Sequence, residues 1–128
     1  MFYTVYMANK VLLIEDDPFL SSLLANRLKR EGFDVLNVKS GNEAVKSLKA
    51  FTPDLVLLDL ILPGKSGFEV LEEMKSDPQA PKVPVIIISN LGQDADLARG
   101  RELGAVDYVI KARTTIDEMV QKVKDFLK

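Results

Sequence analysis

The sequence predicts an α/β protein, a three-layer, doubly wound sandwich in which helices cover both faces of one parallel sheet. Two observations lead to this class. Short apolar, β-rich runs alternate five times with amphipathic stretches along the chain. Several of these runs are apolar almost without interruption, which is typical of strands covered on both faces. Right-handed crossovers between parallel strands then give the doubly wound arrangement.

The predicted strands are the short apolar runs. They span residues 10–15, 34–38, 54–59, 84–89 and 106–111. We expect the sheet order 2-1-3-4-5, in which the first and third strands are neighbours and flank the point where the strand order reverses.

The helices are predicted from apolar stripes and from capping residues. One stripe consists of Leu20, Leu23, Leu24 and Leu28, and another of Ile116, Met119, Val120, Val123, Phe126 and Leu127. Capping boxes mark helix starts at Ser40/Glu43, Ser66/Glu69 and Thr115/Glu118, with a looser version at Asn90/Gln93. Asp17 directly precedes Pro18 and is expected to cap the first helix, and Gly32 and Gly104 lie where the first and fourth helices should stop.

The chain is expected to form one domain. Its 128 residues fall within the usual size of a single domain. Residues 1–9 are interpreted as an N-terminal extension, because Met7 is a natural start and the aromatic segment before it suggests an added tail. Such a segment could instead lengthen the first strand or mediate association. Residues 10–128 then hold the whole domain.

The composition excludes several classes of function. There is no Cys and no His, so thiolate zinc sites, thiol nucleophiles and serine-type triads are absent, and a metal should be a hard, oxygen-ligated ion such as Mg²⁺. The net charge of −2 provides no field for a polyanion, so direct nucleic-acid binding is not expected. With no apolar run of membrane-spanning length and no signal peptide, we expect a cytoplasmic protein without membrane contact.

Polar and charged residues stand at the ends of the predicted strands, where ligands bind in an open parallel sheet. The first strand ends in Glu15, Asp16 and Asp17, the third in Asp59, the fourth in Ser89 and the fifth in Lys111. In the expected order, Asp16, Asp17 and Asp59 face one another in a small cleft. Crowded carboxylates repel unless a cation lies among them, and Mg²⁺ prefers such ligands together with a phosphate oxygen.

The same strand ends suggest phosphoryl chemistry. A carboxylate such as Asp59 can attack phosphorus to give an aspartyl phosphate. The Lys111 ammonium can neutralise the transferred group, and the Ser89 hydroxyl can donate to one of its oxygens.

At these residues the sequence resembles the receiver domain of two-component response regulators, the CheY-like family. The likeness rests on the acidic pair of LLIEDD, the Asp and Pro of LLDLILPGKSG, the hydroxyl of IIISN and the Lys of YVIK, and it runs from about Lys10 to Lys128. The resemblance implies a flavodoxin-like (βα)₅ fold. It also implies a signalling switch that assists its own phosphorylation and dephosphorylation but turns over no separate substrate.

The resemblance assigns a role to each matching residue. Asp59 would be the phosphoacceptor, and Asp16 and Asp17 would hold Mg²⁺ together with Asp59 and the backbone carbonyl of Ile61. Ser89 and Lys111 would contact the phosphoryl group. Tyr108 would swing inward on activation and change the surface of the fourth helix, fifth strand and fifth helix.

The partners implied are a sensor histidine kinase or phosphotransfer protein and an unknown output protein. The chain is expected to be a monomer or a weak homodimer, with mixed charges on its fourth helix at Asp94, Asp96, Arg99, Arg101 and Glu102.

Two positions depart from the family pattern. Ala112 follows Lys111 where the family usually has Pro after a cis bond, and a trans bond is expected here because a cis bond before Ala costs about 3–4 kcal/mol. Asn90 follows Ser89 where small residues are common. Its bulk, like that of Ile61, could restrict the phosphodonor or alter the lifetime of the phosphoryl group.

The same residues do not fit two other classes of phosphate-handling protein. A haloacid dehalogenase type of phosphatase needs Asp-x-Asp at its nucleophile, but Ile61 stands two residues after Asp59, and Asp94/Asp96 falls on a predicted helix face. A P-loop fails because Gly64-Lys65-Ser66 lacks the Gly five positions earlier. A phosphorylation-independent interaction module with the same fold remains as the alternative.

Overall fold

The computed structural model describes residues 8–127. Within that range five parallel strands form one sheet in the order β2-β1-β3-β4-β5, as predicted from the sequence. The strands are β1 (Lys10–Ile14), β2 (Asp34–Val38), β3 (Leu55–Leu58), β4 (Val85–Ser89) and β5 (Asp107–Ile110). Each lies within one residue of its predicted bounds. In β1, β3 and β4 burial on both faces leaves a nearly continuous apolar run in the sequence, whereas the edge strands β2 and β5 are partly exposed.

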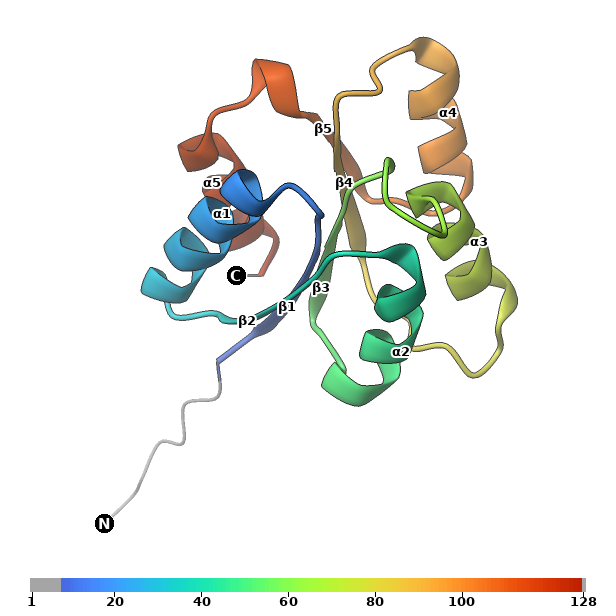
Figure 1. Cartoon of the computed structure of the whole chain (residues 1–128), viewed down its shortest axis with the longest axis horizontal. Coiled ribbons are helices and arrows are strands. Elements are labelled where there is room, and N and C mark those ends of the chain that lie inside the picture. Colours follow the sequence, from blue (N-terminus) through green and yellow to red (C-terminus); the bar gives the residue numbers. More distant parts are fainter. Residues whose placement is uncertain (1–7, 128) are drawn as a thin grey trace.

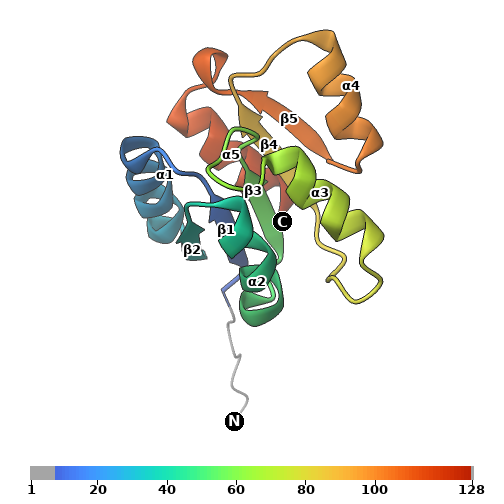
Figure 2. The ribbon, with the colours of Figure 1, turned by 45° about the vertical axis from the view of Figure 1, so that its right-hand side comes forward.

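Helices cover both faces of this sheet. They are α1 (Pro18–Arg30), α2 (Gly41–Phe51), α3 (Gly67–Ser76), α4 (Asp94–Glu102) and α5 (Ile116–Phe126), with a short 3₁₀ helix η1 (Lys111–Arg113) after β5. α1 and α5 pack on one face and α2, α3 and α4 on the other (Figure 1, Figure 2). The three-layer, doubly wound sandwich is therefore confirmed.

The sequence signals at the helix ends are confirmed for most helices. Asp17 caps α1, and Ser40, Ser66 and Thr115 accept hydrogen bonds from Glu43, Glu69 and Glu118 at the starts of α2, α3 and α5. Gly32 and Gly104 follow α1 and α4 with φ of 96° and 94°, which glycine adopts without strain. The looser pair Asn90/Gln93 was wrong, because α4 begins three residues later with Gln93 as its N-cap.

The two apolar stripes are confirmed only in part. Leu24 and Leu28 of α1 are buried, but Leu23 is 40% exposed, and Phe126 of α5 is 44% exposed. In α1 the buried face also includes the small residues Ser21 and Ala25, which let the helix approach the sheet.

Helix α4 is held less firmly than the other helices. Gly100 is its one buried residue, and a Cβ added there would lie 2.7 Å from Cδ1 of Ile87 in β4. Further anchors reach α3: Arg99 pairs with Glu72 at 2.8 Å, with its guanidinium 4.3 Å from the centre of the Phe68 ring. The Lys75 ammonium of α3 also donates to the Glu102 carbonyl at 2.9 Å.

The predicted N-terminal extension and the expected lack of membrane spans can be compared with the described residues. The proposed N-terminal extension, residues 1–9, lies mostly outside the described residues, which begin at Ala8. Among residues 8–127, no helix has the length and apolar character needed to cross a bilayer.

Candidate functional site

The sheet register decides which strand-end residues share a face. Side chains alternate along a strand, so Glu15, Asp59 and Lys111 continue the rows of Leu13, Leu57 and Val109. Those three apolar residues belong to the core beneath α1 and α5. Backbone hydrogen bonds from Glu15 N to the Val38 carbonyl and from Asp59 N to the Ile14 carbonyl carry the pairing one residue past the strands. Two acids and a lysine from three strands are thus placed at one edge of the sheet.

Lys111 connects the acids in this cluster. Its ammonium donates to Oδ2 of Asp59 at 2.9 Å and lies 2.5 Å from Oε1 of Glu15. Asp59 is only 4% exposed, and its other oxygen, Oδ1, accepts from the backbone N–H of Ile61 at 3.3 Å. The Asp59 carboxylate is therefore fixed in direction by one donor on each oxygen.

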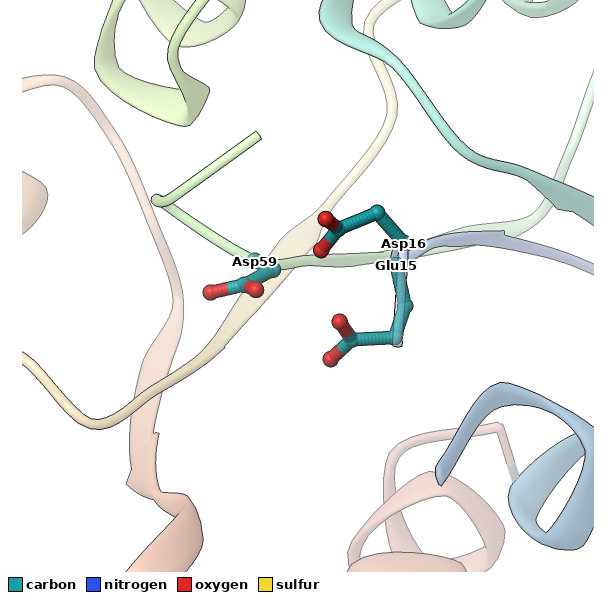
Figure 3. A group of neighbouring side chains, drawn as sticks. All are labelled: Glu15, Asp16 and Asp59. Carbon is teal, nitrogen blue, oxygen red and sulfur yellow. The ribbon is translucent and has the colours of Figure 1, made fainter. Parts of the chain in front are cut away.

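Three carboxylates gather at the ends of β1 and β3. One oxygen from each of Glu15, Asp16 and Asp59 lies within 4.8 Å of the others, and the three groups point to the same side in Figure 3. Glu15 and Asp59 are buried, whereas Asp16 is exposed at the rim. The cluster is therefore open to solvent on one side and enclosed on the other.

Asp17 lies outside this cluster, contrary to the expected pair Asp16–Asp17. Its Oδ1 accepts from the backbone N–H groups of Phe19, at 2.9 Å, and Leu20, at 3.4 Å, at the start of α1. A carboxylate occupied in capping a helix is turned away from the strand ends. Glu15 lies beside Asp16 in the cluster where Asp17 was expected. Its Oε2 accepts a hydrogen bond from the Asp17 N–H at 3.1 Å.

The sequence contained a signal for this exchange. Asp17 directly before Pro18 is a strong helix cap, and the same side chain cannot also reach across to β3. Glu15, in contrast, continues the inward row of β1. The helix cap and the strand alternation together indicate that Glu15, and not Asp17, joins Asp16 and Asp59.

Burial and charge shape the protonation of the cluster. Burial raises the pKa of the Glu15 carboxyl above 4.5, and the Asp59 charge adds to this, although Lys111 opposes it. Burial alone would lower the pKa of the Lys111 ammonium, but its contacts with Glu15 and Asp59 outweigh that effect and hold the pKa above 10.5. A single cation therefore serves a site with an excess of negative charge.

The donor set fits a divalent ion such as Mg²⁺. Its atoms are hard carboxylate oxygens, which Mg²⁺ prefers over nitrogen or sulfur. In addition, the three carboxylates share the ammonium of Lys111, which lies 2.5 Å from the buried Oε1 of Glu15. A divalent ion would offset the negative charge that this one ammonium leaves uncompensated.

The other predicted site residues lie on and beyond β4 and β5. Ser89 is fully buried, and its Oγ accepts from the Leu91 N–H at 3.3 Å. Tyr108 is half-buried, shares the face of Ile87, and donates its hydroxyl proton to the Leu91 carbonyl. Burial, then the charges of Asp96 and Asp59, raise the pKa of the Tyr108 phenol above 10.0. Ser89 and Tyr108 therefore meet at one short loop, residues 89–91.

The structure shows the positions of Ala112, Asn90 and Ile61, which differ from the residues usual in the receiver family. No peptide bond among residues 8–127 is cis, so the bond between Lys111 and Ala112 is trans, as expected. The Asn90 side chain, which the sequence suggested as a helix cap, accepts from the Ala112 N–H at 2.8 Å instead. Ile61 is 60% exposed beside Asp59.

Comparison with known proteins decides the family. The family model described as the response regulator receiver domain matches residues 11–124, almost the whole chain. The chain belongs to this receiver domain family. Receiver domains are signalling switches rather than metabolic enzymes.

One sequence relative and two solved structures show the extent of the likeness. The receiver domain is 37% identical over 122 residues to the phosphate regulon transcriptional regulatory protein PhoB of Rhizobium meliloti (strain 1021), covering 95% of this chain and 53% of PhoB. It is 32% identical to the phosphorylated cyanobacterial phytochrome response regulator RcpA, with a TM-score of 0.79 and coverage of 94% and 91% of the two chains. It is 31% identical to the Mn²⁺-bound response regulator Rcp1, with a TM-score of 0.81 and coverage of 93% and 94%. The chain spans about half the length of PhoB.

Proposed function

We propose that this receiver domain accepts a phosphoryl group on Asp59 from a histidine kinase or phosphotransfer protein. The observation that carries the proposal is the position of Lys111, whose ammonium lies 2.9 Å from Asp59 Oδ2. The carboxylates of Glu15 and Asp16 lie close enough to Asp59, within 4.8 Å, to bind one metal ion together with it. An isolated buried acid would serve no such chemistry. A carboxylate held between a cation and a metal-binding pair is suited to receive phosphorus.

The reaction forms one bond and breaks one. A carboxylate oxygen of Asp59 attacks the phosphorus of a phosphohistidine, the new O–P bond forms, and the P–N bond to the imidazole breaks. The electron pair of that bond stays on the imidazole nitrogen, which takes a proton from water. With acetyl phosphate as the donor, acetate leaves in place of imidazole.

Glu15, Asp16 and Asp59 are proposed to hold Mg²⁺, with the backbone carbonyl of Ile61 as a further ligand. A bound Mg²⁺ would offset the charge that builds up on the phosphoryl oxygens. The relative Rcp1 is described in a Mn²⁺-bound form and RcpA in a phosphorylated form, which supports extending both properties to this chain.

The signal is proposed to leave through the surface of α4, β5 and α5. Ser89, with its hydroxyl on the Leu91 N–H, would turn toward the phosphoryl oxygens, and Tyr108 is linked to the same loop through the Leu91 carbonyl. Tyr108 also lines a surface hollow of about 300 Å³ between α4 and β5. A shift of the loop therefore reaches a surface on which an output protein could dock.

The test is phosphate incorporation into the whole chain. We expect incubation with acetyl phosphate and Mg²⁺ to add the mass of one phosphate, and Asp59→Asn to abolish the addition. Asp94→Asn, at an exposed acid in α4, should keep it. If neither acetyl phosphate nor a kinase mixture gives a mass shift, phosphorylation is ruled out and the interaction module without phosphorylation is the better account.

A further inference from the structure

Asn90, the residue after Ser89, makes a hydrogen bond that the proposed phosphorylation chemistry does not explain. Asn90 directly follows Ser89, and its Oδ1 accepts a hydrogen bond from the backbone N–H of Ala112 at 2.8 Å. Ala112 directly follows Lys111. The Asn90 side chain therefore connects the loop that follows Ser89 to the turn that follows Lys111, across 22 residues of sequence.

The register explains why a side chain is needed at this place. The parallel pairing of β4 and β5 ends with Ser89 opposite Ile110. Beyond it the chain turns into η1, whose first N–H groups have no acceptor within so short a helix. Asn90 supplies that acceptor and extends the connection between the two strands past the last backbone pair.

The contact bears on Lys111 because of the length of its side chain. β4 lies between β3 and β5, so the ammonium must cross one strand to reach Asp59. A small rotation of the turn at Lys111 would move the far end of that side chain away from the carboxylate. Fixing the Ala112 N–H limits such rotation.

We propose that Asn90 is a positioning residue that ties the turn carrying Lys111 to the loop carrying Ser89 and so holds the ammonium on Asp59. The inference rests on the proposed phosphorylation of Asp59 and adds to it a residue that contacts neither metal nor phosphoryl group. It differs from a role for Asn90 as a steric gate, because a gate acts through side-chain bulk and positioning acts through the acceptor oxygen.

Three substitutions separate these two roles. Asn90→Ala removes both bulk and acceptor, Asn90→Leu keeps the bulk and removes the acceptor, and Asn90→Asp keeps an acceptor oxygen. With acetyl phosphate and Mg²⁺ saturating, we expect Asn90→Ala and Asn90→Leu to slow phosphorylation by roughly three- to tenfold, the range that follows from one lost hydrogen bond. Their affinity for Mg²⁺ should not change, since the three carboxylates are untouched. Asn90→Asp should retain most of the rate.

A spectroscopic readout follows the hydrogen bond itself. The Ala112 amide proton shift should depend only weakly on temperature in the parent chain and in Asn90→Asp, and strongly in Asn90→Ala and Asn90→Leu. If the Ala112 proton behaves alike in the parent and in Asn90→Leu, the inference is overturned. If Asn90→Ala is faster than the parent while Asn90→Leu is slower, bulk is the cause and the inference is again overturned.

A double-mutant cycle on stability tests the positioning of Lys111 by Asn90 without phosphorylation. Asn90→Leu, Lys111→Met and the double variant are unfolded in urea without metal. Because a positioned ammonium stabilises the two buried carboxylates, we expect the two substitutions to be non-additive, the second costing less once the first is present. Additive effects would refute the role of Asn90. An unphosphorylated parent chain with non-additive effects would refute the proposed function and leave the positioning role standing.

Discussion

Lys111 and Asp59 are separated by 52 residues in sequence, yet the Lys111 ammonium lies 2.9 Å from Oδ2 of Asp59. They belong to the ends of β5 and β3, with β4 between them. Adjacent strands are about 4.8 Å apart, so the two backbones are roughly 10 Å apart, and only a long side chain spans that distance. The lysine is thus matched in length as well as charge to this sheet order.

Removing the charge of Lys111 should destabilise the fold. Lys111→Met leaves the carboxylates of Glu15 and Asp59 buried without a counter-charge, and we expect a loss of about 2 kcal/mol in the free energy of unfolding. The value lies below the usual cost of breaking a buried pair because the Lys111 side chain is 16% exposed and Glu15 can take up a proton. Urea unfolding at neutral pH measures it.

Lys122 provides the matched control for that substitution. It forms an ion pair with Asp107 at 2.8 Å in which both side chains are more than 40% exposed. Lys122→Met should therefore cost well under 1 kcal/mol. Equal losses for the two methionine variants would contradict the account of Lys111.

The assignment of Glu15, in place of Asp17, to the acidic cluster predicts opposite behaviour for two neighbouring acids. Glu15→Gln removes a buried carboxylate whose ionised form burial disfavours, so the metal-free protein should become more stable by the order of 1 kcal/mol. Its affinity for Mg²⁺, followed by calorimetry, should fall at least about tenfold.

Asp17→Ala should do the reverse. The helix loses its cap and about 1 kcal/mol of stability, while Mg²⁺ binds nearly as before. A large loss of Mg²⁺ affinity in Asp17→Ala, with none in Glu15→Gln, would restore the pair Asp16–Asp17 that the sequence first suggested.

The raised pKa of Tyr108 predicts a loss of stability in alkali. Because burial disfavours the phenolate, the folded protein keeps the Tyr108 proton to higher pH than the unfolded chain, whose phenol titrates near 10.0. The stabilisation is thus complete below pH 10 and is lost as the pH rises from there through the folded pKa. Tyr108→Phe removes this contribution, so its unfolding free energy should fall less steeply above pH 10. Parallel curves for parent and variant would contradict the prediction.

Gly100 predicts a steric coupling between α4 and β4. In Gly100→Ala the new Cβ meets Cδ1 of Ile87 in a fully buried position, and we expect a loss of about 1–3 kcal/mol. Ile87→Val removes that methyl group, so the double variant should be more stable than the sum of the two losses predicts. Thermal unfolding of the four chains tests this, and strict additivity would show that α4 moves aside freely.

The sequence predicted the positions of the strands well because their signal is local, whereas their order was expected from the doubly wound fold class. A strand buried on both faces is apolar throughout, and residues 54–59 and 84–89 end where the first polar side chain appears. Asp59 and Lys111 could be placed for the same reason, since the ends of parallel strands meet at one edge of the sheet.

Two of the remaining differences arise from competition between two roles for one side chain, and a third arises from helix packing. Asp17 could cap a helix or join the carboxylates, and the structure uses it as a cap. Asn90 could cap α4 or bond to another loop, and it bonds to Ala112. Leu23 continues an apolar stripe, yet burial depends on the angle at which α1 meets the sheet. Single-sequence patterns do not contain that information.

The sparse anchoring of α4 affects how the domain can communicate. A helix with one buried glycine, joined to α3 mainly through Arg99 and Lys75, exposes little apolar surface to water when it is displaced. Its position can therefore respond to energies as small as a few hydrogen bonds. Chemical modification at one end of the sheet would then need to supply only a modest free energy to change the shape offered to another protein.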